Sequence, residues 1–390
     1  MSNFIPSDMI NPKVADIPPS GIRKLFDIAQ SMEDVISLGI GEPDFDTPWH
    51  VRNVAIRTLE KGRTQYTGNA GIIGLREEIS AYLNRRFHLQ YDPGDQIIVT
   101  VGGSEAIDLA MRTVICPGDE VLVPSPSFVC YAPIATLAGG IPVPVYTRAE
   151  DNFKLTPALL KKHITPQTKM LVLPFPNNPT GAIMDREDLE AIAEILRDTN
   201  ITVLSDEIYA ELTYSGDRHI SIAEIEGMKD RTILVSGFSK AYAMTGWRLG
   251  YVCAHKAFTK VMLKVHQYAL MCAPTTSQFA AIEAMRNGDE DIELMRREYN
   301  YRRRLIVDGF NEIGLSCFEP EGAFYCFPCI QSTGLSSEEF CRKLLEKERV
   351  ALVPGDAFGP SGEGFVRASY AYSLEHIKTA LDRIKNFLNR

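Results

Sequence analysis

The chain has 390 residues, which is more than one hydrophobic core usually fills, so its length predicts two domains. Its composition, 45% hydrophobic and 23% charged, is that of an ordinary globular protein. The net charge of −9 argues against a nucleic-acid partner, which requires a basic surface, and no apolar run is long enough for a membrane span.

The N-terminus and the cysteines indicate the compartment. Residues 1–10 contain neither a basic nor an apolar segment, so we expect no signal peptide and a cytoplasmic protein with reduced thiols. Cys326 and Cys329 form a C-x-x-C pair, but their surroundings are typical of a strand that ends at Pro328. We therefore predict no metal or redox site.

The elements alternate along most of the chain. Pro18 and Pro19 favour an extended arm before a helix at 22–30. Apolar β-rich runs follow at 96–101, 120–123, 169–173, 201–204, 232–235 and 250–254, with helical patterns at 104–115 and 185–197 between them. Such an alternation predicts an α/β fold with a mostly parallel sheet that helices cover on both faces.

The last hundred residues have a different pattern. A long charged helix is predicted at 293–311, then short strands near 323–327, 351–354 and 364–369, and a closing helix at 374–388. This pattern indicates a smaller α+β unit.

Polar residues follow several of the predicted strands, where ligands bind in parallel sheets: Ser104, Asn178, Asp206 and Lys240. Gly103, Ser104 and Glu105 open a helix after the first strand and would surround a phosphate, with Ser104 as the N-cap, although an ordinary helix cap is the alternative. Phe128 would stack on a cofactor ring or belong to the core.

Asn178 lies in the turn sequence Asn-Asn-Pro-Thr-Gly and would donate to a cofactor oxygen and a substrate carboxylate. Asp206 and Tyr209 follow an apolar strand, where a buried carboxylate needs a partner. The protonated ring nitrogen of pyridoxal 5'-phosphate would be one, and the alternative is a helix cap with a core tyrosine.

Lys240 lies in Ser-Gly-Phe-Ser-Lys, eight residues before Arg248. Burial and nearby cations would lower the lysine pKa, so that Lys240 holds the cofactor aldehyde as a Schiff base (an aldimine), while Arg248 holds the phosphate. Ser236 or Ser239 would add a hydroxyl. Arg367 interrupts an apolar strand and would pair with a substrate carboxylate or with a structural acid.

Together these motifs resemble the class I/II aminotransferases of fold type I, in the branch of aspartate and aromatic aminotransferases. The resemblance extends from Ser-Leu-Gly-Ile-Gly-Glu-Pro-Asp-Phe at 37–45 to Arg367. It implies Lys240 as the Schiff-base lysine, contacts of the ring nitrogen and 3'-oxygen with Asp206 and Tyr209, and α-carboxylate binding by Arg367. It further implies the cofactor-binding and substrate-binding asparagine at Asn178 and substrate proximity for Gly41.

The resemblance also implies a domain organisation. A large cofactor domain would comprise residues 48–288, and an N-terminal arm plus small domain would comprise 1–47 and 289–390. Tyr66 would reach the phosphate of a neighbouring subunit, which implies a homodimer with shared active sites.

The predicted function is ping-pong transfer of an amino group from an L-amino acid to a 2-oxo acid such as 2-oxoglutarate. Ser104 stands where aspartate-specific relatives often carry lysine, which favours aromatic, other apolar or diaminopimelate-type donors. Arg23 would serve a second carboxylate or form a surface salt bridge, and Ile17, Ile22 and Ile40 would suit an apolar side chain.

Two alternatives remain for the activity. A C–S β-lyase would use the same cofactor and the same motifs. A serine hydrolase at Gly-Phe-Ser-Lys-Ala, 237–241, would need a late histidine such as His376, and the second glycine of the motif is missing.

Overall fold

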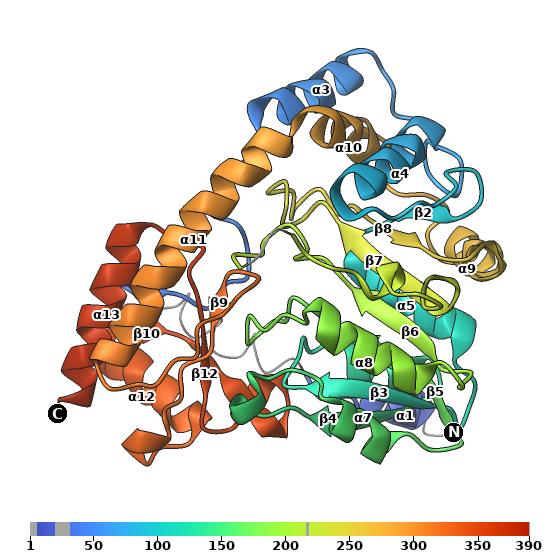
Figure 1. Cartoon of the computed structure of the whole chain (residues 1–390). Helices are drawn as coiled ribbons and strands as arrows, with labels where there is room; N and C mark the ends of the chain where they lie inside the picture. The colour runs from blue at the N-terminus through green and yellow to red at the C-terminus, as the bar shows by residue number, and fades with distance from the viewer. Residues whose placement is uncertain (1–5, 20–31, 216–217, 390) are drawn as a thin grey trace, which may run out of the picture.

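The computed structural model describes residues 6–19, 32–215 and 218–389, and it confirms the α/β fold with a mostly parallel central sheet (Figure 1). The strands are β1 (Ile36–Ser37), β2 (Ile97–Thr100), β3 (Glu120–Ser125), β4 (Ile141–Tyr146), β5 (Thr168–Leu173), β6 (Thr202–Asp206), β7 (Thr232–Gly237), β8 (Gly250–Cys253), β9 (Tyr325–Cys326), β10 (Val350–Ala351), β11 (Val353–Pro354) and β12 (Val366–Ser369). The helices are α1 (Pro12–Ala15), α3 (Trp49–Glu60), α4 (Ile73–Phe87), α5 (Gly103–Val114), α6 (Tyr131–Leu137), α7 (Pro157–His163), α8 (Arg186–Leu196), α9 (Lys256–Ala269), α10 (Thr275–Asn287), α11 (Asp289–Glu312), α12 (Ser337–Glu348) and α13 (Leu374–Leu388).

The central sheet has seven strands in the order β2-β8-β7-β6-β5-β3-β4. The run from β7 to β4 is parallel, whereas β8 is antiparallel to both of its neighbours. The sequence did not predict β4, since Pro142 and Pro144 alternate along it. Proline cannot donate to a sheet ladder, and β4 accommodates two prolines because it is an edge strand.

Alternate residues of the central strands belong to two different cores. Met170 and Val172 of β5 pack in the cluster that contains α5 and α9 residues. Leu171 and Leu173 pack in the cluster that contains α7 and α8 residues. Both faces of the sheet are therefore covered by helices (Figure 1), which explains why the strand sequences are apolar throughout.

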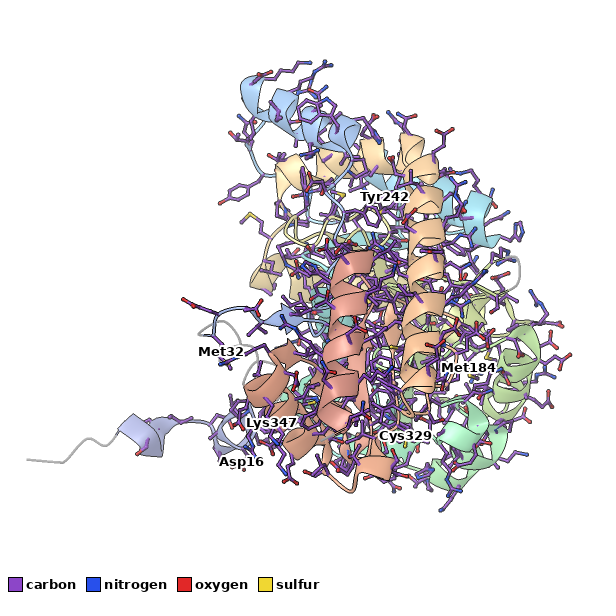
Figure 2. The ribbon with its side chains drawn as sticks, turned by 90° about the vertical axis from the view of Figure 1, so that its left-hand side faces the viewer. Asp16, Met32, Met184, Tyr242, Cys329 and Lys347 are labelled. Atoms are coloured by element: carbon purple, nitrogen blue, oxygen red, sulfur yellow. The ribbon has the colours of Figure 1, made fainter. Side chains whose placement is uncertain are left out.

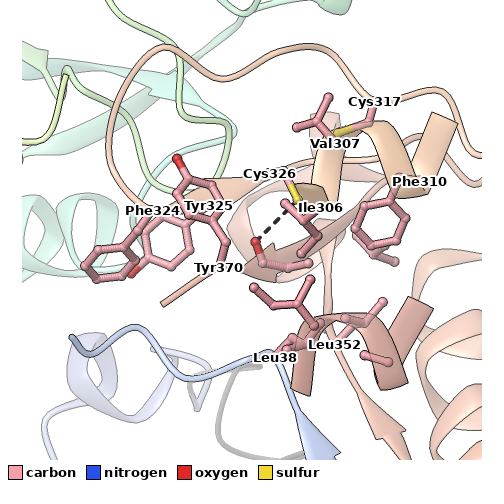
Figure 3. Packing of buried hydrophobic residues seen from close by; sticks show 14 of the residues in the cluster. Leu38, Ile306, Val307, Phe310, Cys317, Phe324, Tyr325, Cys326, Leu352 and Tyr370 are labelled. Carbon is pink, nitrogen blue, oxygen red and sulfur yellow. Dashed lines mark hydrogen bonds between the residues drawn. The ribbon is translucent and has the colours of Figure 1, made fainter. Parts of the chain in front are cut away.

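The smaller unit has its own core (Figure 3). Its strands form the antiparallel sheet β11-β12-β9 and the parallel pair β1-β10. The helix α11 spans roughly 36 Å and connects the two units. Ile292 near its start packs in a large-domain cluster, and Ile306 and Phe310 pack in the small-unit core.

We propose the domain division expected from the sequence, 48–288 against 1–47 with 289–390. Pairing of β1 with β10 supports placing residues before 48 with the smaller unit. Packing of α3 against α10 supports placing the residues after 48 with the large domain. Residues 6–19, around Asp16 in Figure 2, lie to one side of the body. The expected helix at 22–30, with Ile22 and Arg23, falls outside the described residues.

Neither a membrane span nor a metal centre is found in the described ranges. No helix there combines the length and the apolarity needed to cross a bilayer. Within the same ranges no group of three or more His, Cys, Asp or Glu side chains could hold a metal ion, and Cys326 is buried while Cys329 is partly buried.

Candidate active site

A cavity of about 850 Å³ lies beyond the carboxyl ends of β2, β3, β5, β6 and β7, with β9 and β12 of the smaller unit on its other side. Most of the predicted site residues line it: Gly41, Gly103, Ser104, Phe128, Asn178, Asp206, Tyr209, Ser239, Lys240, Arg248 and Arg367. The parallel strands bring together residues that are far apart in the sequence.

Lys240 follows β7 and extends into this pocket. Its Nζ donates a hydrogen bond of 2.5 Å to the Gly41 carbonyl oxygen and lies 5.5 Å from the Phe324 ring centroid. The Lys240 pKa is lowered to about 8, mainly by burial; Glu42 raises it, whereas the charges of Arg367 and Arg248 lower it. Lys240 is thus poised to act as a nucleophilic amine near neutral pH.

Asp206 ends β6 as a buried carboxylate. Its oxygens accept hydrogen bonds from Tyr131 Oη at 2.7 Å and from the Ile208 backbone N–H at 3.2 Å. No cation among the described residues contributes to the pKa of Asp206, and burial raises that pKa to about 6. A carboxylate in this state is stabilised by a cationic N–H, such as a protonated pyridine nitrogen.

The start of α5 and Arg248 form the other end of the pocket. Gly102 is the N-cap, with φ of 80°, and a Cβ placed there would lie 2.6 Å from Arg248 Nη2, so only glycine fits. The prediction that Ser104 is the N-cap is therefore wrong: α5 begins at Gly103, and Ser104 is exposed in its first turn. The helix N–H groups, Arg248 and Ser239 make this end suitable for a phosphate.

Arg367 in β12 lies at the small-unit side of the pocket. Its Nη1 donates to Asn178 Oδ1 at 2.8 Å, and its Nη2 donates to the Gly39 carbonyl oxygen at 2.5 Å. The centre of its guanidinium lies 4.4 Å from the Tyr325 ring centroid and 4.9 Å from the Phe358 ring centroid, and its buried Nε has no hydrogen-bond partner among the described residues. It has no ion-pair partner among the described side chains, so a carboxylate ligand would satisfy it.

Three predicted residues lie elsewhere. The Glu105 carboxylate accepts from the Val101 N–H and contacts His266 Nδ1 at 2.5 Å, so only its backbone N–H remains for a phosphate. Ser236 Oγ donates to the Glu207 carbonyl oxygen at 3.3 Å. Tyr66 is 81% exposed and lines no part of this chain's pocket.

Sequence reasoning missed Tyr131, Tyr325 and Glu42, which also line the pocket. The sequence offered a clue to Tyr131, because this residue lies three residues beyond the predicted site residue Phe128, at the start of a helix. The clue to Tyr325 was weaker: it lies in a short strand between the core residues Phe324 and Cys326. His376, proposed for a hydrolase, is exposed in the first turn of α13.

A partly buried lysine, a buried carboxylate and a helix start suited to a phosphate, all at the carboxyl edge of a mostly parallel sheet, are the features of a pyridoxal-phosphate enzyme of fold type I. The family model for aminotransferase class I and II matches residues 33–384, so the chain belongs to this family. It is accordingly a pyridoxal-phosphate-dependent aminotransferase, and Asp206 and Arg367 provide buried charges that fit this cofactor and an amino-acid carboxylate.

Individual relatives agree along nearly the whole chain. The YugH protein of Bacillus subtilis (strain 168) is 54% identical over 377 residues, which cover 97% of each chain. The aspartate aminotransferase of Pyrococcus abyssi (strain GE5 / Orsay) is 46% identical over 374 residues, covering 95% of this chain and 96% of the relative. The crystal structure of an aromatic aminotransferase from Pyrococcus horikoshii OT3 superposes with a TM-score of 0.90 at 45% identity, covering 94% of this chain and 98% of that chain.

Proposed function

We propose that Lys240, Asp206 and Tyr209 are the catalytic residues of this aminotransferase. When bound, pyridoxal phosphate supplies an aldehyde that binds amines and a ring that accepts electrons from the substrate Cα. Phosphate binding is assigned to the backbone of Gly103, Ser104 and Glu105, with Ser239 and Arg248. Phe128 would stack on the ring, and Ser236 would act only as a support behind this loop.

The pocket residues would divide the proton chemistry among them. Asp206 keeps the ring nitrogen protonated, which its burial without a cationic partner supports. Lys240 Nζ, once released by the incoming amine, would remove the proton from the substrate Cα. It would then deliver that proton to the cofactor carbon that carries the aldehyde. Tyr209 donates to the ring oxygen, together with the Asn178 side-chain amide.

The substrate carboxylate would bind Arg367, with Asn178 beside it and the Gly41 segment above it. Among the described residues that line the pocket, the cations are Lys240, Arg248 and Arg367, and each already has a proposed partner. No described cation is left for a distal carboxylate of the donor, whereas Ile40 and Phe128 are apolar. This observation favours an aromatic or other apolar amino donor over aspartate, with a 2-oxo acid as acceptor.

We also propose a homodimer with shared active sites in the cytoplasm. Large apolar side chains are exposed on α3, at Tyr66 and at the end of α9: Trp49, Ile56, Leu59, Tyr66, Tyr268, Leu270 and Met271. Asn69 Nδ2 donates to the Met271 carbonyl oxygen at 2.8 Å, which joins two of these segments. A second copy would cover this surface and present Tyr66 to the neighbouring phosphate.

The test is a set of half-reactions followed by absorbance. The purified protein with pyridoxal phosphate receives phenylalanine, aspartate, lysine or cystathionine separately, without any 2-oxo acid. We expect the cofactor band to shift fully to that of the aminated form, fastest with phenylalanine. A faster conversion by aspartate would contradict the proposed donor class, and pyruvate released from cystathionine without acceptor would indicate the C–S β-lyase instead.

A further inference from the structure

Tyr325 connects the smaller unit to the pocket. It is the first residue of β9, its side chain is 1% exposed, and it lines the pocket. Figure 3 shows it on the side of the small-unit core nearest to the large-domain ribbon. Its backbone is therefore fixed by the small-unit sheet while its hydroxyl reaches the site.

Tyr325 contacts both Tyr209 and Arg367. In the proposed function, Tyr209 binds the cofactor and Arg367 binds the substrate. The Tyr325 Oη lies 2.9 Å from Tyr209 Oη, the residue assigned to the cofactor ring oxygen. Its ring centroid lies 4.4 Å from the centre of the Arg367 guanidinium, which is assigned to the substrate carboxylate. Tyr325 thus stands between the cofactor side and the substrate side of the pocket.

The direction of the tyrosine hydrogen bond follows from counting protons. Each phenol has one proton, so a Tyr209 that donates to the ring oxygen must accept from Tyr325. Among the described residues, Tyr325 Oη has no other hydrogen-bond partner. The guanidinium over its ring draws electron density from the phenol and makes it a better donor.

Charged groups face both phenols, but the pair stays neutral near pH 7. Burial is the largest cause that raises the pKa of Tyr325 and of Tyr209, and Arg367 opposes it in both. Glu42 raises the pKa of Tyr325, Asp206 raises that of Tyr209, and Lys240 Nζ lies 5.8 Å from the Tyr209 ring centroid. The pair therefore acts through hydrogen-bond donation and not through ionisation.

We propose that Tyr325 is a positioning residue that donates to Tyr209 Oη, directs the Tyr209 proton toward the cofactor ring oxygen and couples that proton to the charge at Arg367. This inference rests on the proposed function, because it takes the ligands of Tyr209 and Arg367 from it.

The test reads the pKa of the bound cofactor from a pH titration of its visible absorbance, with no substrate present. A donor to the ring oxygen stabilises the deprotonated cofactor and lowers that pKa. Hydrogen bonds in a chain strengthen one another by roughly 10–30%, and one bond to a charged oxygen shifts a pKa by roughly 1–2 units, so Tyr325→Phe should raise the cofactor pKa by a few tenths of a unit. In a Tyr209→Phe background, the same substitution should add less than about 0.1 unit, because the relay is already broken.

Two further variants separate the relay from general packing. Tyr370→Phe is the matched control, since Tyr370 is buried in the same core, donates to the Ala323 carbonyl oxygen at 3.1 Å and does not line the pocket. Its cofactor pKa should equal that of the wild type. Gly41→Ala keeps the phenol but places a Cβ against Tyr325 Oη, and it should reproduce the rise.

An unchanged cofactor pKa in Tyr325→Phe with full cofactor content would overturn the inference. So would a rise of equal size in the Tyr209→Phe background, because Tyr325 would then act without Tyr209. Absence of a cofactor band in the wild type would instead refute the proposed function, so the two failures are distinguishable.

Discussion

The Arg367 side chain donates to Asn178 Oδ1 at 2.8 Å, which joins β12 of the smaller unit to the loop after β5 of the central sheet. The bond holds the guanidinium in one orientation before a carboxylate arrives. Removing it should therefore weaken carboxylate binding more than it slows the later proton transfer.

Asn178→Ala should raise KM for the amino donor about tenfold, which corresponds to one charge-assisted hydrogen bond. Arg367→Lys should cost about a hundredfold in kcat/KM, because a lysine cannot form the paired contacts of a guanidinium. Steady-state kinetics checks both, with an amine that lacks a carboxylate as the control substrate. An equal loss for that amine would show that Asn178 does not act through the carboxylate.

Lys240→Ala should reduce transamination by at least about a thousandfold, since the variant loses the amine that holds the cofactor and moves the Cα proton. Borohydride reduction followed by mass spectrometry should find the cofactor attached to wild-type protein and not to the variant. Lys260→Ala, which removes an exposed lysine on α9, is the matched control and should behave as the wild type.

Cofactor uptake should depend on pH through Lys240. Only the neutral amine reacts, so the rate for cofactor-free protein should rise with a midpoint near the Lys240 pKa of about 8. Glu42 raises that pKa, so Glu42→Gln should move the midpoint to lower pH and speed uptake at pH 7. A midpoint unchanged by Glu42→Gln would show that Glu42 does not act on the lysine.

Asp206 should make the cofactor-free protein less stable as the pH rises. Its pKa is about 6 when folded and near 3.8 when unfolded, so the folded state binds the proton more tightly. Its stabilising effect is complete below pH 3.8 and is lost as the pH rises through 6, a change of about 3 kcal/mol in the free energy of unfolding.

Urea denaturation of cofactor-free wild type and Asp206→Asn at several pH values tests this dependence. The stability of the variant relative to the wild type should increase between pH 4 and 7. A constant difference across that range would contradict the burial argument. With pyridoxal phosphate bound, the wild type should regain stability at pH 7, because the ring nitrogen then pairs with the carboxylate.

Shared active sites predict complementation between two impaired variants. Each active site would take Lys240 from one subunit and Tyr66 from the other. Tyr66→Ala and Lys240→Ala would therefore remove residues that two different subunits supply to the same site. A mixed dimer would then contain one intact site, so equal mixing with subunit exchange should restore about a quarter of the wild-type sites. Activity that stays at the sum of the separate variants would show that Tyr66 serves its own subunit.

The sheet and most of the pocket could be predicted from the sequence because two regular sequence patterns indicate them. Apolar runs identify parallel strands, and polar residues directly after such runs gather at one edge, as Asp206 and Lys240 do. The direction of β8 and the existence of β4 depend on tertiary pairing and edge position, which no local pattern encodes.

Side-chain directions were harder to predict. Glu105 is adjacent to pocket residues, yet its carboxylate turns back to the Val101 N–H and His266, because α5 begins two residues earlier than a cap at Ser104 would require. Tyr325 is separated from Tyr209 by 116 positions, so their contact follows from the docking of the two units.

The helix α11 contributes Ile292 to a core of the large domain and Ile306 and Phe310 to the core of the smaller unit. Loss of either core would remove the packing that keeps one half of the helix folded. We therefore expect calorimetry of the protein to give one cooperative melting transition, with no temperature range in which one unit of the chain is molten and the other native. A protein with this construction would respond to a destabilising substitution anywhere along α11 by lowering the melting point of the whole chain.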